Sequence, residues 1–140
     1  MIVLDTTVLV YAVGADHPLA DASRGLIESI ARGDLDATTT PEVLQEFTHV
    51  RARRRTRADA AALARELAEL LAPLLVVKAE HLAAGLDLYE GHADLGAFDA
   101  VLAAVALAAD ADALVSTDRA FSAVPNLRTL GPGDPELTTG

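Results

Sequence analysis

Short apolar runs alternate with stretches of helical spacing along the whole 140-residue chain. The runs are rich in Val, Ile and Leu, which is typical of buried strands. Such an alternation predicts an α/β fold, in which helices cover both faces of a central parallel sheet. We expect four to five strands, at residues 2–4, 35–38, 74–77, 113–115 and 127–130. Helices are expected at residues 8–13, 19–31, 41 into the arginine-rich segment, 58–72, 79–89 and 97–109.

The composition excludes several classes of protein. The chain has no cysteine, which removes disulfide scaffolds, zinc–thiolate sites and thiol nucleophiles and fits a reducing compartment. The net charge of -10 disfavours wrapping of duplex DNA. No apolar run reaches the ~18 residues of a membrane span, and the opening MIVLDTT lacks the basic start of a signal peptide. We therefore expect a cytoplasmic protein with one domain, residues 1–130, and a flexible tail, residues 131–140.

Two aspartates directly follow predicted strands. Asp5 comes after the first strand, and Asp118 closes the segment that follows the strand at residues 113–115. Ligand sites in open parallel sheets lie beyond the carboxyl ends of the strands, so both carboxylates are candidates for a site there. Aspartate after a strand is also a favoured helix N-cap. Capping and a functional role therefore remain open for both residues.

Glu46 lies on or beside the face of its predicted helix that should be buried. It shares a stripe with Val43, Phe47 and Val50. A buried carboxylate must be paired, hydrogen-bonded, protonated or bound to a metal, because an unpaired buried charge costs several kcal/mol. A salt bridge to Arg51 or Arg53 is the structural alternative to a functional role.

Asp99 is the one polar side chain in an otherwise apolar helix at residues 97–109. Such a helix is buried on nearly all sides, so this carboxylate requires a partner. A helix cap is the structural alternative, if the preceding residues belong to the loop. Asp94, in that loop, is an outside candidate for the same site and is more typical of a turn.

These four acids come from separate parts of the chain, and their convergence would raise at least one pKa unless a divalent cation bound there. Only oxygen ligands are on offer, which favours Mg²⁺ or Mn²⁺. A carboxylate-only cation site is suited to the hydrolysis of phosphate esters. Two other functions stay open. One is a Mg²⁺-dependent phosphatase or phosphotransfer domain, and the other is a pure interaction or DNA-binding module, which would leave Asp99 unexplained.

Four motifs in this order resemble the PIN-domain family and, within it, the VapC toxins of bacterial toxin–antitoxin modules. The motifs are Asp5-Thr6-Thr7 after an apolar strand, the segment PEVLQEF from Pro41 to Phe47, Phe98-Asp99-Ala100, and LVSTD from Leu114 to Asp118 with Phe121 after it. The resemblance extends over residues 1–130. It implies a three-layer α/β/α fold and an endoribonuclease that requires Mg²⁺ or Mn²⁺.

The same resemblance assigns roles to individual residues. Asp5, Glu46, Asp99 and Asp118 match the family's catalytic, metal-binding acidic quartet, and Thr6 and Ser116 match its supporting hydroxyl positions. Thr7 stands where the family often has asparagine, and its hydroxyl can still donate and accept a hydrogen bond. The implied partners are an RNA substrate, a VapB-type antitoxin whose tail occupies the active site, and a second copy in a homodimer or a higher toxin–antitoxin assembly.

A cluster of arginines follows the helix that carries Glu46. Two interpretations are open for it: a solvated helix end favoured by the helix dipole, or a track for RNA phosphates. We favour the RNA track, because a local basic ridge would hold a polyanion near an acidic site. Acidic residues of the antitoxin could also dock there. The cluster consists of Arg51, Arg53, Arg54, Arg55 and Arg57.

Overall fold

The computed structural model describes residues 1–14 and 16–138, and these residues contain a four-stranded parallel sheet in the order β2-β1-β3-β4. The strands are β1 (Ile2–Leu4), β2 (Ala37–Thr38), β3 (Ala113–Val115) and β4 (Thr129–Leu130). Leu4 of β1 is in register with Val115 of β3. The α/β class and the parallel sheet predicted from the sequence are confirmed.

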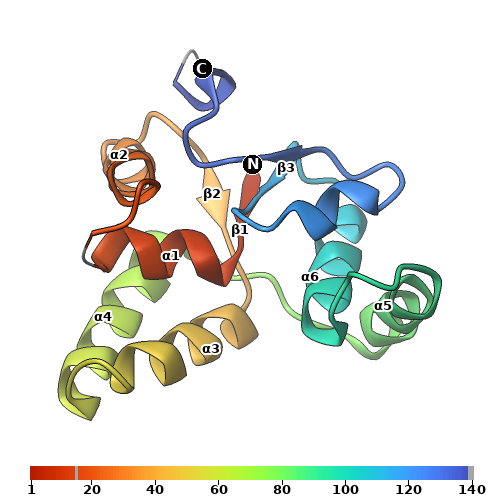
Figure 1. Cartoon of the computed structure of the whole chain (residues 1–140), viewed down its shortest axis with the longest axis horizontal. Coiled ribbons are helices and arrows are strands. Elements are labelled where there is room, and N and C mark those ends of the chain that lie inside the picture. Colours follow the sequence, from red (N-terminus) through yellow and green to blue (C-terminus); the bar gives the residue numbers. More distant parts are fainter. Residues whose placement is uncertain (15, 139–140) are drawn as a thin grey trace.

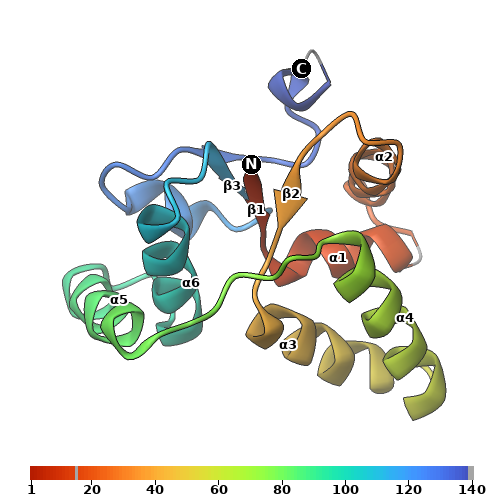
Figure 2. The same ribbon diagram turned by 180° about the vertical axis from the view of Figure 1, so that it is seen from behind.

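Six α-helices in the described residues cover this sheet. Figure 1 shows α1 to α4 on one side of the strands and α5 and α6 on the other, and Figure 2 shows the same division from behind. This is the three-layer arrangement that the family resemblance implied. The helices are α1 (Thr6–Val13), α2 (Ala20–Ala31), α3 (Pro41–Ala52), α4 (Arg57–Leu70), α5 (Ala79–Gly91) and α6 (Ala97–Ala108). None of them is both long and apolar enough to span a membrane.

The strand predicted at residues 74–77 is wrong. This segment is an extended connection whose Leu75 amide donates one hydrogen bond, 2.9 Å long, to the carbonyl oxygen of Thr39. Leu74 and Leu75 pack against the core, whereas Val76 is 66% exposed. The apolar residues therefore cover the end of the sheet without pairing in it, and periodicity cannot separate these two uses of a short apolar run.

The core is built around β1 and β3, with α6 on one face of the sheet and α1 to α4 on the other (Figure 1). Val3, Leu4, Leu114 and Val115 are fully buried, as expected for strands covered on both faces. Several small residues of α6, including Ala100 and the fully buried Ala103 and Ala106, complete this core.

Gly85 sets the distance between α5 and α6. A β-carbon at this position would lie 2.8 Å from the α-carbon of Val101. Gly85→Ala is expected to destabilise the protein by about 1–3 kcal/mol, because the clash is with backbone and cannot be relieved by a side-chain rotation. Urea unfolding measures the effect. Gly91→Ala, at the end of the same helix with open space around its β-carbon, is the matched control and should not lower stability.

Residues 131–138 are the described part of the tail, residues 131–140, that the sequence predicted to be flexible, and the buried Pro132 and Leu137 anchor them to the domain. They contain the short helix η2 (Pro135–Leu137), and Leu137 is 4% exposed and belongs to the core cluster. The burial of Leu137 could not be predicted, because a single leucine followed by small polar residues has no periodic pattern.

Candidate active site

Asp5 is the most buried of the four candidate acids, with 3% of its surface exposed. Because β1 and β3 are neighbouring parallel strands in register, the residues that follow them, Asp5 and Ser116, meet at one edge of the sheet. Asp5 occupies the N-cap position of α1, but its side chain makes no capping hydrogen bond. The capping alternative therefore does not account for this carboxylate.

Two hydroxyl groups hold Asp5 by the same oxygen, Oδ2. Ser116 Oγ donates to it at 2.6 Å and Thr7 Oγ1 at 3.0 Å. Each hydroxyl in turn accepts a backbone amide, Ser116 from Asp118 at 3.0 Å and Thr7 from Thr117 at 3.3 Å. Since each hydroxyl oxygen faces an amide donor, its proton is free to point to Asp5. The turn after β3 thereby fixes the orientation of the Asp5 carboxylate.

Glu46 is half-buried on α3 and accepts a hydrogen bond from Thr6 Oγ1, with 3.1 Å between Oγ1 and Oε2. No arginine of the described residues forms an ion pair with it. Arg51, the expected alternative partner, instead pairs with Asp59 at 2.7 Å and donates to the carbonyl oxygen of Val13 at 3.1 Å. The salt-bridge alternative for Glu46 is therefore not found.

Asp99 is the third residue of α6, whose N-cap is Gly96, so the capping alternative fails here too. Burial of its carboxyl is the largest cause of a pKa for Asp99 that is raised from the ordinary 3.8 to about 7. The other causes of this raised pKa, in decreasing order, are the negative charges of Asp5, Asp118 and Glu46. No basic group and no contribution from Asp94 is among the causes. The fold therefore brings Asp5, Glu46 and Asp118 within electrostatic reach of Asp99.

Asp118 combines both roles considered for it. Its Oδ1 accepts the amide of Ala120 at 2.9 Å and caps the short helix η1 (Arg119–Ala123), while its charge acts on Asp99. The side chain is exposed, so it forms the open rim of the site. Within residues 1–14 and 16–138, no three acidic or histidine side chains are already grouped as ligands of one ion. The other three acids act electrostatically on Asp99, but the side chains are not already arranged as the ligands of one ion.

The arginine cluster divides into two parts. Arg51 has a side chain only 13% exposed, and its guanidinium is engaged by Asp59. Arg53, Arg54, Arg55 and Arg57 are exposed at the corner between α3 and α4, and none of them has an ion-pair partner in the described residues.

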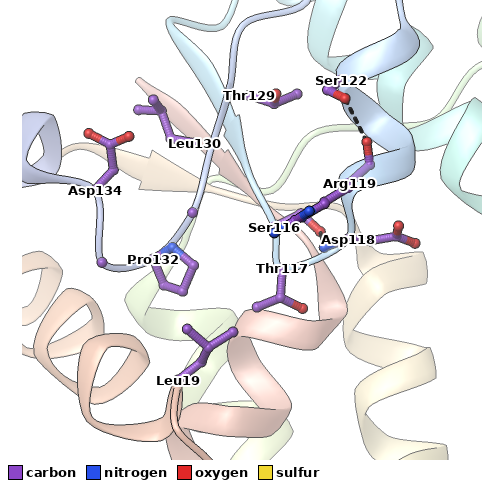
Figure 3. Close-up of a pocket in the computed structure, with 12 residues that line it drawn as sticks. Leu19, Ser116, Thr117, Asp118, Arg119, Ser122, Thr129, Leu130, Pro132 and Asp134 are labelled. Carbon is purple, nitrogen blue, oxygen red and sulfur yellow. Dashed lines mark hydrogen bonds between the residues drawn. The ribbon is translucent and has the colours of Figure 1, made fainter.

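A pocket of about 420 Å³ adjoins the acidic site. Ser116 and Asp118 line it, together with residues from β4 and from the segment after it (Figure 3). This pocket has no signature in the sequence, because its wall at residues 129–134 depends on how the C-terminal segment packs. Thr7 departs from the family pattern, yet it supports the site by its hydrogen bond to Asp5. Its position two residues after Asp5, at the end of a strand, is the signal in the sequence for this contact.

Comparison with known proteins identifies the family. The model of the PIN domain matches residues 2–127. Ribonuclease VapC7 of Mycobacterium tuberculosis is 55% identical over 126 residues, which cover 87% of this chain and 85% of the relative. Among solved structures, M. tuberculosis VapC20, a sarcin–ricin loop cleaving toxin, superposes with a TM-score of 0.75 at 21% identity, covering 88% of this chain and 94% of its own. VapBC2 from Rickettsia felis, bound to a promoter DNA fragment, gives a TM-score of 0.72 at 22% identity and coverage of 94% and 98%. The chain belongs to the PIN domain family and, within it, to the VapC proteins.

Proposed function

We propose that this protein is an endoribonuclease that requires Mg²⁺ or Mn²⁺ and serves as the toxin of a type II toxin–antitoxin pair. One observation carries the proposal: three other carboxylates act on Asp99, and no basic group offsets them. The close relative VapC7 is named a ribonuclease, and VapC20 is described as a toxin that cleaves the sarcin–ricin loop. Phosphotransfer through an aspartate favours a lysine near the phosphoryl group, and no lysine contributes to the field at Asp99.

The donor set fits a hard divalent cation. It consists only of carboxylate and hydroxyl oxygens, which Mg²⁺ and Mn²⁺ prefer, and the concentration of negative charge at Asp99 is what such an ion would balance. Asp5, Asp99 and Asp118 would hold the principal cation, and Glu46 would position a second ion or the attacking water. When bound, the cation would supply positive charge for the phosphate oxygens and a more nucleophilic water.

The side chains around the acids have orienting roles. Ser116 and Thr7 hold Asp5 by Oδ2, and no side chain of the described residues donates to its Oδ1. Thr6 in the same way orients Glu46. A carboxylate fixed on one oxygen presents the other in a defined direction at no further entropic cost, which is the preorganisation that phosphodiester hydrolysis needs. Cleavage then proceeds by direct attack of water, without a covalent enzyme intermediate.

RNA cleavage by the purified protein tests the proposal. A mixed, structured RNA pool is incubated with Mg²⁺, with Mn²⁺ or with EDTA, beside the Asp5→Asn variant. We expect cutting by the wild type with either cation, and none with EDTA or with the variant. Equal cutting in EDTA would contradict metal dependence, and equal cutting by a folded Asp5→Asn protein would contradict the assigned site.

A VapB-type antitoxin is the proposed protein partner. The fold neighbour VapBC2 is a complex, seen bound to promoter DNA. The net charge of -10 disfavours DNA binding by the present chain, so the antitoxin would bind the DNA. The tail of the antitoxin would occupy the acidic site.

The exposed arginines of the α3–α4 corner are proposed to bind RNA phosphates. The double change Arg53→Gln and Arg54→Gln, made in the Asp5→Asn background, is expected to weaken binding of single-stranded RNA. It should also reduce the slope of log affinity against log salt by roughly 0.7 per lost phosphate contact. Fluorescence anisotropy over a salt series measures both. The double change Arg32→Gln and Arg65→Gln is the control of equal charge, and an equal effect of the two pairs would contradict a local RNA track.

The apolar stripe of α5 is the proposed homodimer face. Leu82, Leu86 and Tyr89 follow the spacing of one helical face and are about half exposed, with Phe98 and Val76 also exposed. A two-fold dimer brings the same stripe of both copies together. Sedimentation of the wild type and of Leu86→Glu tests this proposal. We expect the wild type to be a dimer and Leu86→Glu to be a monomer. A dimer of Leu86→Glu would exclude this face.

A further inference from the structure

The pocket of about 420 Å³ beside the acidic site has the size of a small-molecule site, for which ~300–1,000 Å³ is usual. It opens from the acidic site itself, because Ser116 and Asp118 belong to both. A polymer whose phosphodiester lies at the four acids continues away from them in two directions, and the pocket beside Asp118 offers a place for one of the two neighbouring residues.

The chemistry of the pocket wall suits a nucleotide. Leu19, Leu130 and Pro132 supply an apolar surface for the flat face of a base, and they lie on one side of the turn at residues 116–118 (Figure 3). Thr129 and the carboxylate of Asp134 supply polar groups for the edge of a base or a ribose hydroxyl. RNA-binding proteins read unstacked nucleotides with this combination of a face contact and polar edge contacts.

Arg119 supplies the positive charge. It lines the pocket, directly follows Asp118, and its guanidinium forms no ion pair or side-chain hydrogen bond within the described residues. Arg24, Arg32, Arg51 and Arg128 all have acidic partners. This unpaired guanidinium is exposed at a pocket that shares Asp118 with the acidic site, and it is not among the groups that act on Asp99. It is free to take a phosphate there by two parallel hydrogen bonds.

We propose that this pocket binds the nucleotide of the RNA strand adjacent to the phosphodiester held at the acidic site, with Arg119 on its phosphate. The inference rests on the proposed function, since it assigns a subsite to the same substrate. It makes this pocket, rather than the acids, the place where the identity of a neighbouring base is read.

Nuclear magnetic resonance of the full chain tests the subsite without cleavage. The probes are the four ribonucleoside 5′-monophosphates, added singly in EDTA so that no cation draws phosphate to the acids, with inorganic phosphate as a separate arm. We expect at least one nucleotide to shift the amides of Thr117, Arg119 and Gly131 more strongly than phosphate does. Gly131→Phe should weaken this binding at least tenfold, because a β-carbon there meets open space and the ring extends into the pocket. Gly131→Ala, which adds only that β-carbon, is the matched control and should bind as the wild type does.

RNA cleavage provides a second readout. Arg119→Ala is expected to raise KM about tenfold with kcat little changed, because a contact made equally before and during the reaction affects KM alone. Arg65→Ala, which removes another exposed and unpaired arginine on α4, should change neither constant.

The outcomes separate this inference from the proposed function. Nucleotide shifts at the pocket in a protein that cuts no RNA would support the subsite and contradict the ribonuclease. RNA cutting without nucleotide shifts would overturn the subsite, and a protein segment would then be the occupant to test in this pocket. Equal shifts with phosphate alone, or unchanged binding by Gly131→Phe, would also overturn it.

Discussion

Asp99→Asn is expected to reduce RNA cleavage on the order of a hundred- to a thousandfold. Asparagine keeps the size of the side chain but removes the negative charge at the centre of the acidic site, where three other acids act. Initial rates of cleavage in Mn²⁺ measure the effect. The loss should appear in kcat as well as in kcat/KM, because the charge is needed in the reaction and not only for binding RNA.

Asp94→Asn is the matched control for this change. Asp94 is exposed in the loop before α6 and does not contribute to the field at Asp99, so its variant should cut RNA at the wild-type rate. Full activity of a folded Asp99→Asn protein would remove this carboxylate from the chemistry. A similar loss in both variants would indicate a general dependence on negative charge near α6.

The second large effect is on the stability of the metal-free protein. The pKa of Asp99 is raised from 3.8 to about 7 in the folded chain, so between these values the folded protein keeps a proton that the unfolded chain has released. Stability therefore falls as pH rises through this window, and the loss is complete above about pH 7. Asp99→Asn has no such proton to lose. In EDTA, the difference between the thermal midpoint of Asp99→Asn and that of the wild type should therefore increase, in favour of the variant, from pH 5 to pH 7.5.

Comparison of the two proteins at each pH cancels the titration of groups that do not interact with Asp99, so the remaining difference reports Asp99 and the three acids coupled to it. Added Mn²⁺ should raise the midpoint of the wild type at pH 7.5 and have little effect on Asp99→Asn, because a ligand that binds only the folded state stabilises it. A difference between the two proteins that stays constant from pH 5 to pH 7.5 would contradict the raised pKa of Asp99.

The sequence predicted the sheet and all six helices because each element carries its own local signal, a short apolar run for a strand and helical spacing of apolar residues for a helix. The short apolar run at residues 74–77 has the same pattern as a strand, but it packs on the core as an extended connection. Whether such a run joins the sheet depends on which backbone groups lie beside it. Asp5 and Asp118 could be placed because both follow predicted strands, and such strand ends share an edge when the strands are neighbours and parallel. Asp99 could be singled out because a lone carboxylate in an apolar helix requires an explanation.

Other features of the site depend on contacts between distant segments. The sequence offered Arg51 as a partner of Glu46 and as a member of the basic cluster, but the start of α4 places Asp59 beside it. The hydrogen bond from Thr7 to Asp5 is local, yet its direction is set by the amide of Thr117, 110 positions away. Asp118 is both a helix cap and a member of the acidic site, since one of its oxygens caps η1 while its charge acts on Asp99.

Direct titration of Mn²⁺ into the metal-free protein, followed by electron paramagnetic resonance, tests the central claim that the four carboxylates form a cation site for RNA cleavage. The wild type should bind at least one Mn²⁺ per chain, and Asp5→Asn and Asp99→Asn should each bind it at least tenfold more weakly, in parallel with their loss of cleavage. Asp94→Asn should bind as the wild type does. Binding of Mn²⁺ by Asp99→Asn as tight as that of an active wild type would contradict the assignment of the site.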